Sequence, residues 1–295
     1  MANRRLIILF SLLAALLLLA TTPGGALDGP DSVSYVHAAR DLRAGLPMRG
    51  YHGDPYVQWG PLYPILLSIW NDPYTGARWY NALAIAVTMG LTLILGSSFL
   101  SRRMLIAVGF AVLLGPPILP VYQMAISEPL FIVFVLMFLW AVTRLEQRGS
   151  LALLTISVTL ALLQRLVGVI LIPLGIGLVF WLERQHKGKA LRDAILFALL
   201  PSLAYIAWGL YGIWVSGRAG PPATPIYNLY EATLVSFYTI VQWIPTVLLP
   251  MIVVVLIALW RRRKHARTWG NRSIFSGVSQ HDDRSQHADS GVVSQ

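Results

Sequence analysis

The sequence contains no cysteine, which excludes disulfide bonds and thiolate metal sites. Charged residues are also scarce, at 12% of the 295 residues, whereas soluble domains contain about 25%. Hydrophobic residues make up 56%, and apolar runs of about 18–25 residues recur, the length that crosses about 30 Å of hydrocarbon. The composition therefore predicts an all-α, multi-pass transmembrane protein in a cell membrane.

Acidic residues are fewer than basic ones, 13 against 23, which gives a net charge of +10. Nucleic-acid-binding proteins also carry such an excess, because a basic face contacts phosphates. Here, however, the basic residues cluster at the ends of apolar runs, where the positive-inside rule places them in cytoplasmic loops. We therefore expect no nucleic-acid partner and a chain that is surrounded by membrane lipid.

Eight apolar runs are candidate membrane spans. They are Leu6–Ala20, Arg78–Leu100, Met104–Val121, Pro129–Val142, Leu151–Leu163, Leu166–Leu182, Ala194–Val215 and Val235–Trp260. Every short loop that this arrangement places inside carries Lys or Arg, so both termini are expected in the cytoplasm. The run Met104–Val121 is expected to be broken near its outer end by Gly115-Pro116-Pro117 and Pro120. The fourth and fifth runs are short for a full crossing. They are either continuous with their polar flanks or buried within protein.

These spans divide the chain into four parts. Residues 1–22 are expected to form a transmembrane signal-anchor, with a cleavable signal peptide as the alternative. Residues 23–77 form an extracytoplasmic loop with a surface helix, and residues 78–264 form the transmembrane helical core. Residues 265–295 lack periodicity and are expected to be a disordered cytoplasmic tail.

The extracytoplasmic loop concentrates the polar residues. Behind Asp31, the pattern SVSYVHAARDLRAG predicts a short helix that ends at Gly45. Its apolar stripe predicts that it lies along the membrane surface; the stripe consists of Tyr35, Ala38, Ala39 and Leu42. The following PLYPILLSIW is too short to span, so it is expected to dip into the interface, anchored there by Tyr63 and Trp70.

Four ionisable residues fall on the outer side in this arrangement: Asp31, Glu128, Arg165 and Arg218. Ionisable groups at membrane depth are costly and usually face a polar cavity or a partner. A carboxylate can act as a general base, and arginine offers forked donors to phosphate oxygens. The four residues therefore predict a site for an anionic ligand next to a hydroxyl that is deprotonated. Nothing in the sequence calls for a metal or a cofactor.

Each of these residues also has a purely structural interpretation. Asp31 is placed to cap the helix that follows it, and Glu128 to cap the span that it begins. Arg165 is placed to extend from a helix end toward water, and Arg218 is placed as an ordinary loop residue. The sequence leaves both interpretations open.

Three stretches share an order and a spacing with one enzyme family. They are DSVSY with AARDLRAG and QWGPLYP, then ISEPLF, then QRLVG. They resemble the GT-C glycosyltransferases that use polyprenyl-phosphate sugars, which include protein O-mannosyltransferases and the lipid A aminoarabinose transferase. The similarity runs from about Met1 to Thr246. It implies a GT-C-type bundle that transfers a sugar, with inversion, from polyprenyl phosphate to a glycan, lipid or protein acceptor at the outer face.

The resemblance also implies roles for single residues. Asp31 matches the loop acid that acts as the general base for the acceptor. Tyr35, Tyr63 and Glu128 match family positions at which substrate is expected to bind. Arg165 matches the arginine near the lipid-linked phosphate, and Arg218 is a second candidate there.

The sequence differs from the family pattern in two ways. A second Pro stands in the family where this chain has Gly60, which is expected to loosen the loop backbone, and Thr-Arg stands where it has Gln164-Arg165. Family members also usually continue through more spans. The alternatives are therefore a non-catalytic or truncated membrane subunit, or a transporter or flippase of lipid-linked precursors, although no internal repeat typical of transporters is present.

Overall fold

A computed structural model describes residues 2–29, 31–115, 118–145, 147 and 149–217. All of them belong to the first of the two units into which the chain divides, Met1–Ile226. Three of the sequence predictions lie outside the described residues: the eighth span Val235–Trp260, the tail 265–295 and the site residue Arg218.

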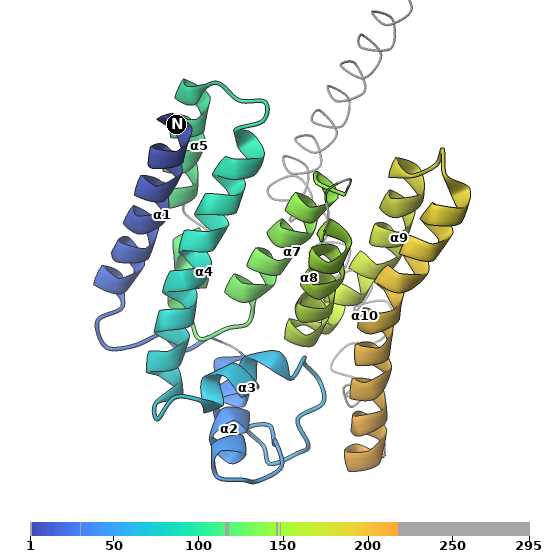
Figure 1. The fold of residues 1–295 in the computed structure, drawn as a ribbon. Helices are drawn as coiled ribbons and strands as arrows, with labels where there is room; N and C mark the ends of the chain where they lie inside the picture. Colours follow the sequence, from blue (N-terminus) through green and yellow to red (C-terminus); the bar gives the residue numbers. More distant parts are fainter. Residues whose placement is uncertain (1, 30, 116–117, 146, 148, 218–295) are drawn as a thin grey trace, which may run out of the picture. The chain divides into compact units, whose positions relative to one another are not determined.

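Helices make up 75% of the described residues, and no strand is found among them. The helices are α1 Ala2–Thr21, α2 Ser32–Arg43, α3 Leu62–Ser68, α4 Pro73–Gly96, α5 Arg102–Leu114, α6 Ile118–Gln123, α7 Glu128–Val142, α8 Ser150–Gln164, the 3-10 helix η1 Leu166–Ile170, α9 Leu171–Leu182 and α10 Lys187–Ser216 (Figure 1). Helices α1, α4 and α10 are each long and apolar enough to cross a membrane, and α7, α8 and the η1–α9 segment are shorter apolar helices. The prediction of an all-helical protein with several membrane-type helices is confirmed.

Neighbouring helices pack in a chain of contacts. Helix α1 packs along α4, α4 contacts α7, α7 contacts α8, and α10 contacts both α8 and α9. Two apolar cores result, one centred on α1 and α4 and one on α8 and its neighbours. The N-terminus and the α4–α5, α7–α8 and α9–α10 connections lie at one end of these helices, while α2 and α3 lie at the other (Figure 1).

Helix α4 begins earlier than the predicted start of its span, Arg78. Asp72 precedes the helix, and its carboxylate accepts hydrogen bonds from the backbone N–H groups of Tyr74 and Thr75, at 3.3 and 3.0 Å. Pro73 occupies the first turn, where its fixed φ suits a helix and its missing N–H costs nothing. The Asp72–Pro73 pair therefore starts the helix more than one turn before the position that hydropathy alone predicts.

The predicted span Met104–Val121 is interrupted at Gly115, where the sequence predicts a break. Helix α5 ends at Leu114, and Gly115 follows in an extended conformation, with φ −62° and ψ 120°. A residue before proline is pushed out of the α region by the proline ring, and Pro116 follows Gly115 directly. The chain resumes helical structure only in the short α6.

Helix α2 forms where the sequence predicts it and ends at Arg43, two residues before Gly45, which has φ +72°. Its apolar stripe, however, faces protein and not membrane. Tyr35, Ala38 and Ala39 have no exposed surface, because α2 packs against α3 and α4. The prediction of a helix lying on the lipid surface through this stripe is wrong.

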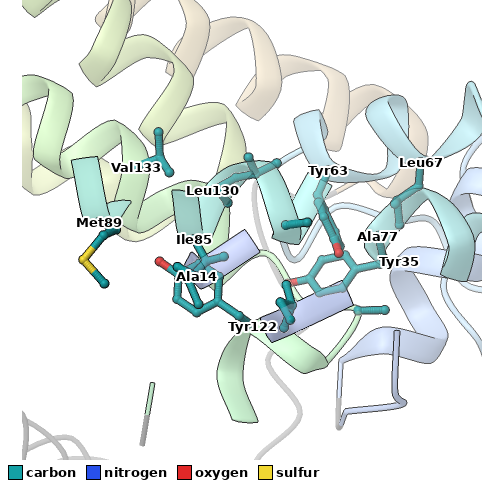
Figure 2. Close-up of a cluster of buried hydrophobic side chains, with 14 of the residues drawn as sticks. Ala14, Tyr35, Tyr63, Leu67, Ala77, Ile85, Met89, Tyr122, Leu130 and Val133 are labelled. Atoms are coloured by element: carbon teal, nitrogen blue, oxygen red, sulfur yellow. The ribbon is translucent and has the colours of Figure 1, made fainter. Parts of the chain in front are cut away.

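Tyr63 likewise does not anchor α3 in an aromatic belt. Its side chain is fully buried and meets the Tyr35 ring edge-on, with ring centroids 5.2 Å apart. Figure 2 shows the two rings next to each other within the buried cluster that α1, α4 and α7 also line. Both tyrosines belong to the protein core under the polar loop.

A second connection crosses the polar loop and holds it in place. Leu27, in the α1–α2 connection, pairs with the α6–α7 connection: its N–H donates to the Gln123 carbonyl at 2.7 Å, and its own carbonyl accepts from Ala125 at 2.8 Å. The buried Asn81 of α4 donates to the carbonyls of Tyr122 and Met124. These bonds fix the start of α2 beside the start of α7.

Candidate functional site

Three helix ends meet where the two connections are joined. Asp31 precedes α2, Glu128 begins α7, and Arg165 follows α8. Five of the six predicted site residues are described, and the structure brings them together, since each interacts with at least two of the others electrostatically or by direct contact. They are Asp31, Tyr35, Tyr63, Glu128 and Arg165.

The partly exposed side chain of Arg165 contacts acidic and hydroxyl groups of the protein. It stands between α8 and η1 in an extended conformation, with φ −147° and ψ 130°. Its Nη1 pairs with Glu128 Oε1 and donates to Ser127 Oγ at 3.1 Å. The other guanidinium nitrogens have no partner among the described residues. Arg165 is therefore a fixed cation with spare donors, which does not fit a residue that merely extends to solvent.

Asp31 stands at the N-cap of α2, but its side chain makes no capping hydrogen bond. The neighbouring Ser32 makes a hydrogen bond in the preceding turn, where its Oγ accepts from the N–H of Gly29 at 2.7 Å. Asp31 is only partly exposed. Burial, and then the neighbouring Glu128 carboxylate, raise the pKa of Asp31, while Arg165 acts in the opposite direction. The carboxyl group thus makes no capping bond and is easier to protonate than usual.

Glu128 combines a structural and a site role. It lies in the first turn of α7, where a negative charge is favourable next to the helix dipole. One carboxylate oxygen pairs with Arg165, and Oε2 is buried without a partner among the described residues. The negative charge of Glu128 therefore acts on both Arg165 and Asp31.

Ser127 was not singled out from the sequence, yet it connects the site. It is fully buried, its Oγ lies 3.0 Å from the Tyr35 hydroxyl, and its carbonyl accepts from Nε2 of Gln164 at 3.1 Å. A serine before Glu-Pro at a helix start looks like an ordinary N-cap, so the local sequence gave no reason to expect these contacts.

Tyr35 and Tyr63 lie on the buried side of the site. Both are fully buried, and burial raises the pKa of each hydroxyl well above its usual value, so both remain protonated. The Tyr35 hydroxyl meets Ser127, while the Tyr63 hydroxyl has no partner among the described residues. Their contact with substrate stays a prediction, and in this structure they support the residues that flank the site.

Gly60 does not loosen its loop, contrary to the expectation from sequence. It is buried, and a Cβ added there would lie 2.1 Å from the Leu163 carbonyl oxygen. The Tyr56 hydroxyl also donates to the Gly60 carbonyl at 3.2 Å. Because glycine has no side chain, the loop packs directly on the last turn of α8. Gly60 thus helps to place Arg165, two residues beyond Leu163.

We expect Gly60→Ala to lower the free energy of unfolding by about 1–3 kcal/mol, because the new methyl group must push two backbones apart. Thermal unfolding of the purified protein measures this effect. Gly177→Ala in α9 is the matched control: no atom lies within 4 Å of an added Cβ there, and alanine favours a helix over glycine by about 0.5–1 kcal/mol. Equal stability of both variants would show that the loop yields easily at Gly60.

The arrangement offers two chemical functions side by side. Asp31 is a carboxyl group with a raised pKa and no hydrogen-bond partner among the described residues, and Arg165 is a cation held in place that suits an anion. Within the described part of the chain, no group of three or more His, Cys, Asp or Glu is placed to hold a metal ion.

Comparisons of the chain with protein-family models, with curated proteins and with solved structures found no match in any of the three.

Proposed function

We propose that this protein is a membrane glycosyltransferase of GT-C type that moves a sugar from a polyprenyl-phosphate donor to an acceptor at the extracytoplasmic face. The observation that carries the proposal is the Asp31 carboxyl group, which makes no cap although it stands at an N-cap, and which lies within electrostatic reach of Glu128 and Arg165. A free carboxylate beside a held arginine suits a reaction that removes a proton from a hydroxyl and releases a phosphate.

In the proposed reaction, Asp31 removes the proton of the acceptor hydroxyl. The oxygen attacks the anomeric carbon from the face opposite the phosphate, which forms the new glycosidic bond. The bond from the anomeric carbon to the phosphate oxygen breaks, and its electron pair leaves with polyprenyl phosphate. Arg165 stabilises the negative charge that develops on this leaving group, with Arg218 as the second candidate from the sequence. The product has inverted configuration.

Asp31 is a better proton acceptor than Glu128 in this arrangement. One oxygen of Glu128 is paired with Arg165, so this oxygen is occupied and less available to an acceptor hydroxyl. Asp31 has no such partner, and its pKa is raised by burial and by Glu128. A base is most effective when its pKa approaches the working pH, so the environment favours Asp31.

The proposed outward location of the site follows from the distribution of basic residues between the two ends of the helices. The end of the helices opposite α2 and α3 carries the basic connections (Figure 1), including Arg102 and Arg103 at the start of α5 and Lys187 and Lys189 at the start of α10. Basic loops remain in the cytoplasm. The site would then face outward, and eight spans with both termini inside remain the proposed topology.

Cysteine labelling in intact cells tests this topology. His52→Cys should react with a membrane-impermeant maleimide, whereas Gly188→Cys should react only after the membrane is permeabilised. His52 is exposed and avoids the strained φ of +82° at Gly53, and Gly188 has open space around its Cα. The chain has no native cysteine, so each label is unique. The opposite pattern would place the site in the cytoplasm.

The proposed activity is tested with purified protein in vesicles that contain a polyprenyl-phosphate hexose and candidate acceptors. Mass spectrometry should detect sugar-free polyprenyl phosphate that accumulates with the modified acceptor, while nucleotide sugars support no transfer. If the donor lipid moves between leaflets without losing its sugar, the protein is a flippase. If the donor is neither moved nor consumed, the non-catalytic alternative stands.

A further inference from the structure

We infer that Ser127 is a positioning residue, which holds the guanidinium of Arg165 where the lipid-linked phosphate binds. The inference rests on the proposed function and adds a residue to its anion site. It is carried by the placement of one hydroxyl group, between Arg165 of the α8–η1 junction and Tyr35 of α2.

Ser127 does not do what a serine at a helix start usually does. Serine is favoured at N-caps because its oxygen accepts a backbone N–H of the first turn. Ser127 is the N-cap of α7, yet it makes no such bond, and its backbone is helical, with φ −80° and ψ −14°. Its Oγ accepts instead from Nη1 of Arg165 at 3.1 Å and lies 3.0 Å from the Tyr35 hydroxyl. Helix α7 therefore lacks a serine cap, and the hydroxyl contacts Arg165 and Tyr35 instead.

The direction of these bonds follows from the groups themselves. A guanidinium has only donors, so Ser127 Oγ must accept from Arg165, and its own hydrogen remains for the Tyr35 oxygen or is turned away if Tyr35 donates. Tyr35 is fully buried and packs edge-on against Tyr63 and Tyr56. The buried Tyr35 therefore fixes the position of the serine hydroxyl, which in turn fixes the position of the Arg165 guanidinium.

Ser127 and Glu128 hold the same nitrogen with different consequences. The carboxylate of Glu128 neutralises the charge of Arg165. A phosphate that binds Arg165 must therefore compete with that carboxylate. The hydroxyl of Ser127 is neutral, so it orients the guanidinium without reducing its attraction for an anion. A pre-oriented arginine also loses less side-chain freedom when the phosphate binds.

The test compares Ser127→Ala with the parent protein in two assays. We expect Ser127→Ala to weaken binding of a polyprenyl monophosphate about tenfold, the effect typical of one lost hydrogen bond to a charged group. The KM for the donor should rise by a similar factor, with a smaller change in kcat. Ser157→Ala is the matched control, because Ser157 is also fully buried and its hydroxyl bonds, among the described residues, only to the Leu153 carbonyl of its own helix, α8.

A double-mutant cycle separates positioning from a structural effect. In an Arg165→Leu background, Ser127→Ala should cause no further loss of lipid-phosphate binding, because the residue through which it acts is gone. An equal loss in both backgrounds, or unchanged binding by Ser127→Ala alone, overturns the inference, as does a parent protein that binds no polyprenyl phosphate. A parent that binds the lipid phosphate but transfers no sugar overturns only the proposed function.

Discussion

Replacing Asp31 with Asn is expected to reduce glycosyl transfer by about 10²-fold or more, because an amide cannot accept the proton of the acceptor hydroxyl. The same variant should be at least as stable as the parent. The Asp31 side chain makes no capping bond that could be lost, and Asn caps a helix about as well as Asp in any case. Activity is measured as donor turnover in vesicles, and stability as the midpoint of thermal unfolding.

The raised pKa of Asp31 gives this prediction a pH signature. The base works when ionised, so transfer by the parent should rise with pH through a pKa above the usual carboxyl value. Stability should change in the opposite sense. Since the folded state binds this proton more tightly than the unfolded state, the parent loses stability as pH rises from the unfolded pKa past the folded one. Asp31→Asn should not show that loss.

Asp54→Asn is the control for the acidic loop, since Asp54 is exposed and lies away from the Asp31 carboxyl in the Gly50–Asp54 turn. It should change turnover by no more than a few-fold. If Asp31→Asn retains the parent's turnover in the same assay, Asp31 is not the base. A large loss of stability in Asp31→Asn would instead show that the carboxylate is structural.

Replacing Arg165 with Leu is expected to lower transfer by about 10²–10³-fold, the range found when one donor to a developing negative charge is removed. The loss should occur in both donor binding and turnover, because the lipid phosphate is charged before and after the reaction. Arg165→Lys keeps the charge but loses the forked donors, so it should lie between the parent and Arg165→Leu. Titration with polyprenyl phosphate separates binding from turnover.

Removal of Arg165 also leaves two carboxylates without their cation, which lowers stability and complicates the comparison. Arg165→Leu combined with Glu128→Gln addresses this. The double variant should recover much of the lost stability, because the partly buried Glu128 charge is gone, while transfer stays low. If transfer recovers with stability, Arg165 only balances Glu128 and does not bind phosphate.

The two single variants should also move the pH profile in opposite directions. Glu128 raises the pKa of Asp31, and Arg165 lowers it. Glu128→Gln should therefore shift the rise in transfer to lower pH, and Arg165→Leu should shift its residual transfer to higher pH. Movement in the same direction would show that a different group controls the profile.

The helices themselves were largely predictable. Apolar runs predicted α1, α7 and α8 to within a few residues of their ends, and the stop of α2 before Gly45 follows from the ability of glycine to adopt φ +72°. These features depend on the side chains of neighbouring residues. The broken run after Met104 was also signalled locally, by the proline that follows Gly115.

The orientation of each helix face was less predictable. The stripe of α2 is equally suited to a lipid surface and to a protein surface, because both are apolar. In the tertiary structure this stripe faces protein, because α2 packs on α3 and α4. Gly60 shows the same limit, since the sequence does not distinguish a glycine that loosens a loop from one that leaves no room for a Cβ beside Leu163.

The sequence by itself determined a helical membrane-type protein and, through a resemblance, which polar residues to examine. Only the tertiary structure decided that these residues meet: Tyr35 and Ser127 are 92 positions apart, and Ser127 and Arg165 are 38 apart. The bonds of Asn81 and Leu27 to the α6–α7 connection bring them together. Asp31 and Ser127 each stand at a helix start, where capping is the local optimum. Neither side chain caps its helix. For Ser127 the reason is that its hydroxyl contacts Tyr35 and Arg165 from other parts of the chain, and such partners cannot be deduced from neighbouring residues.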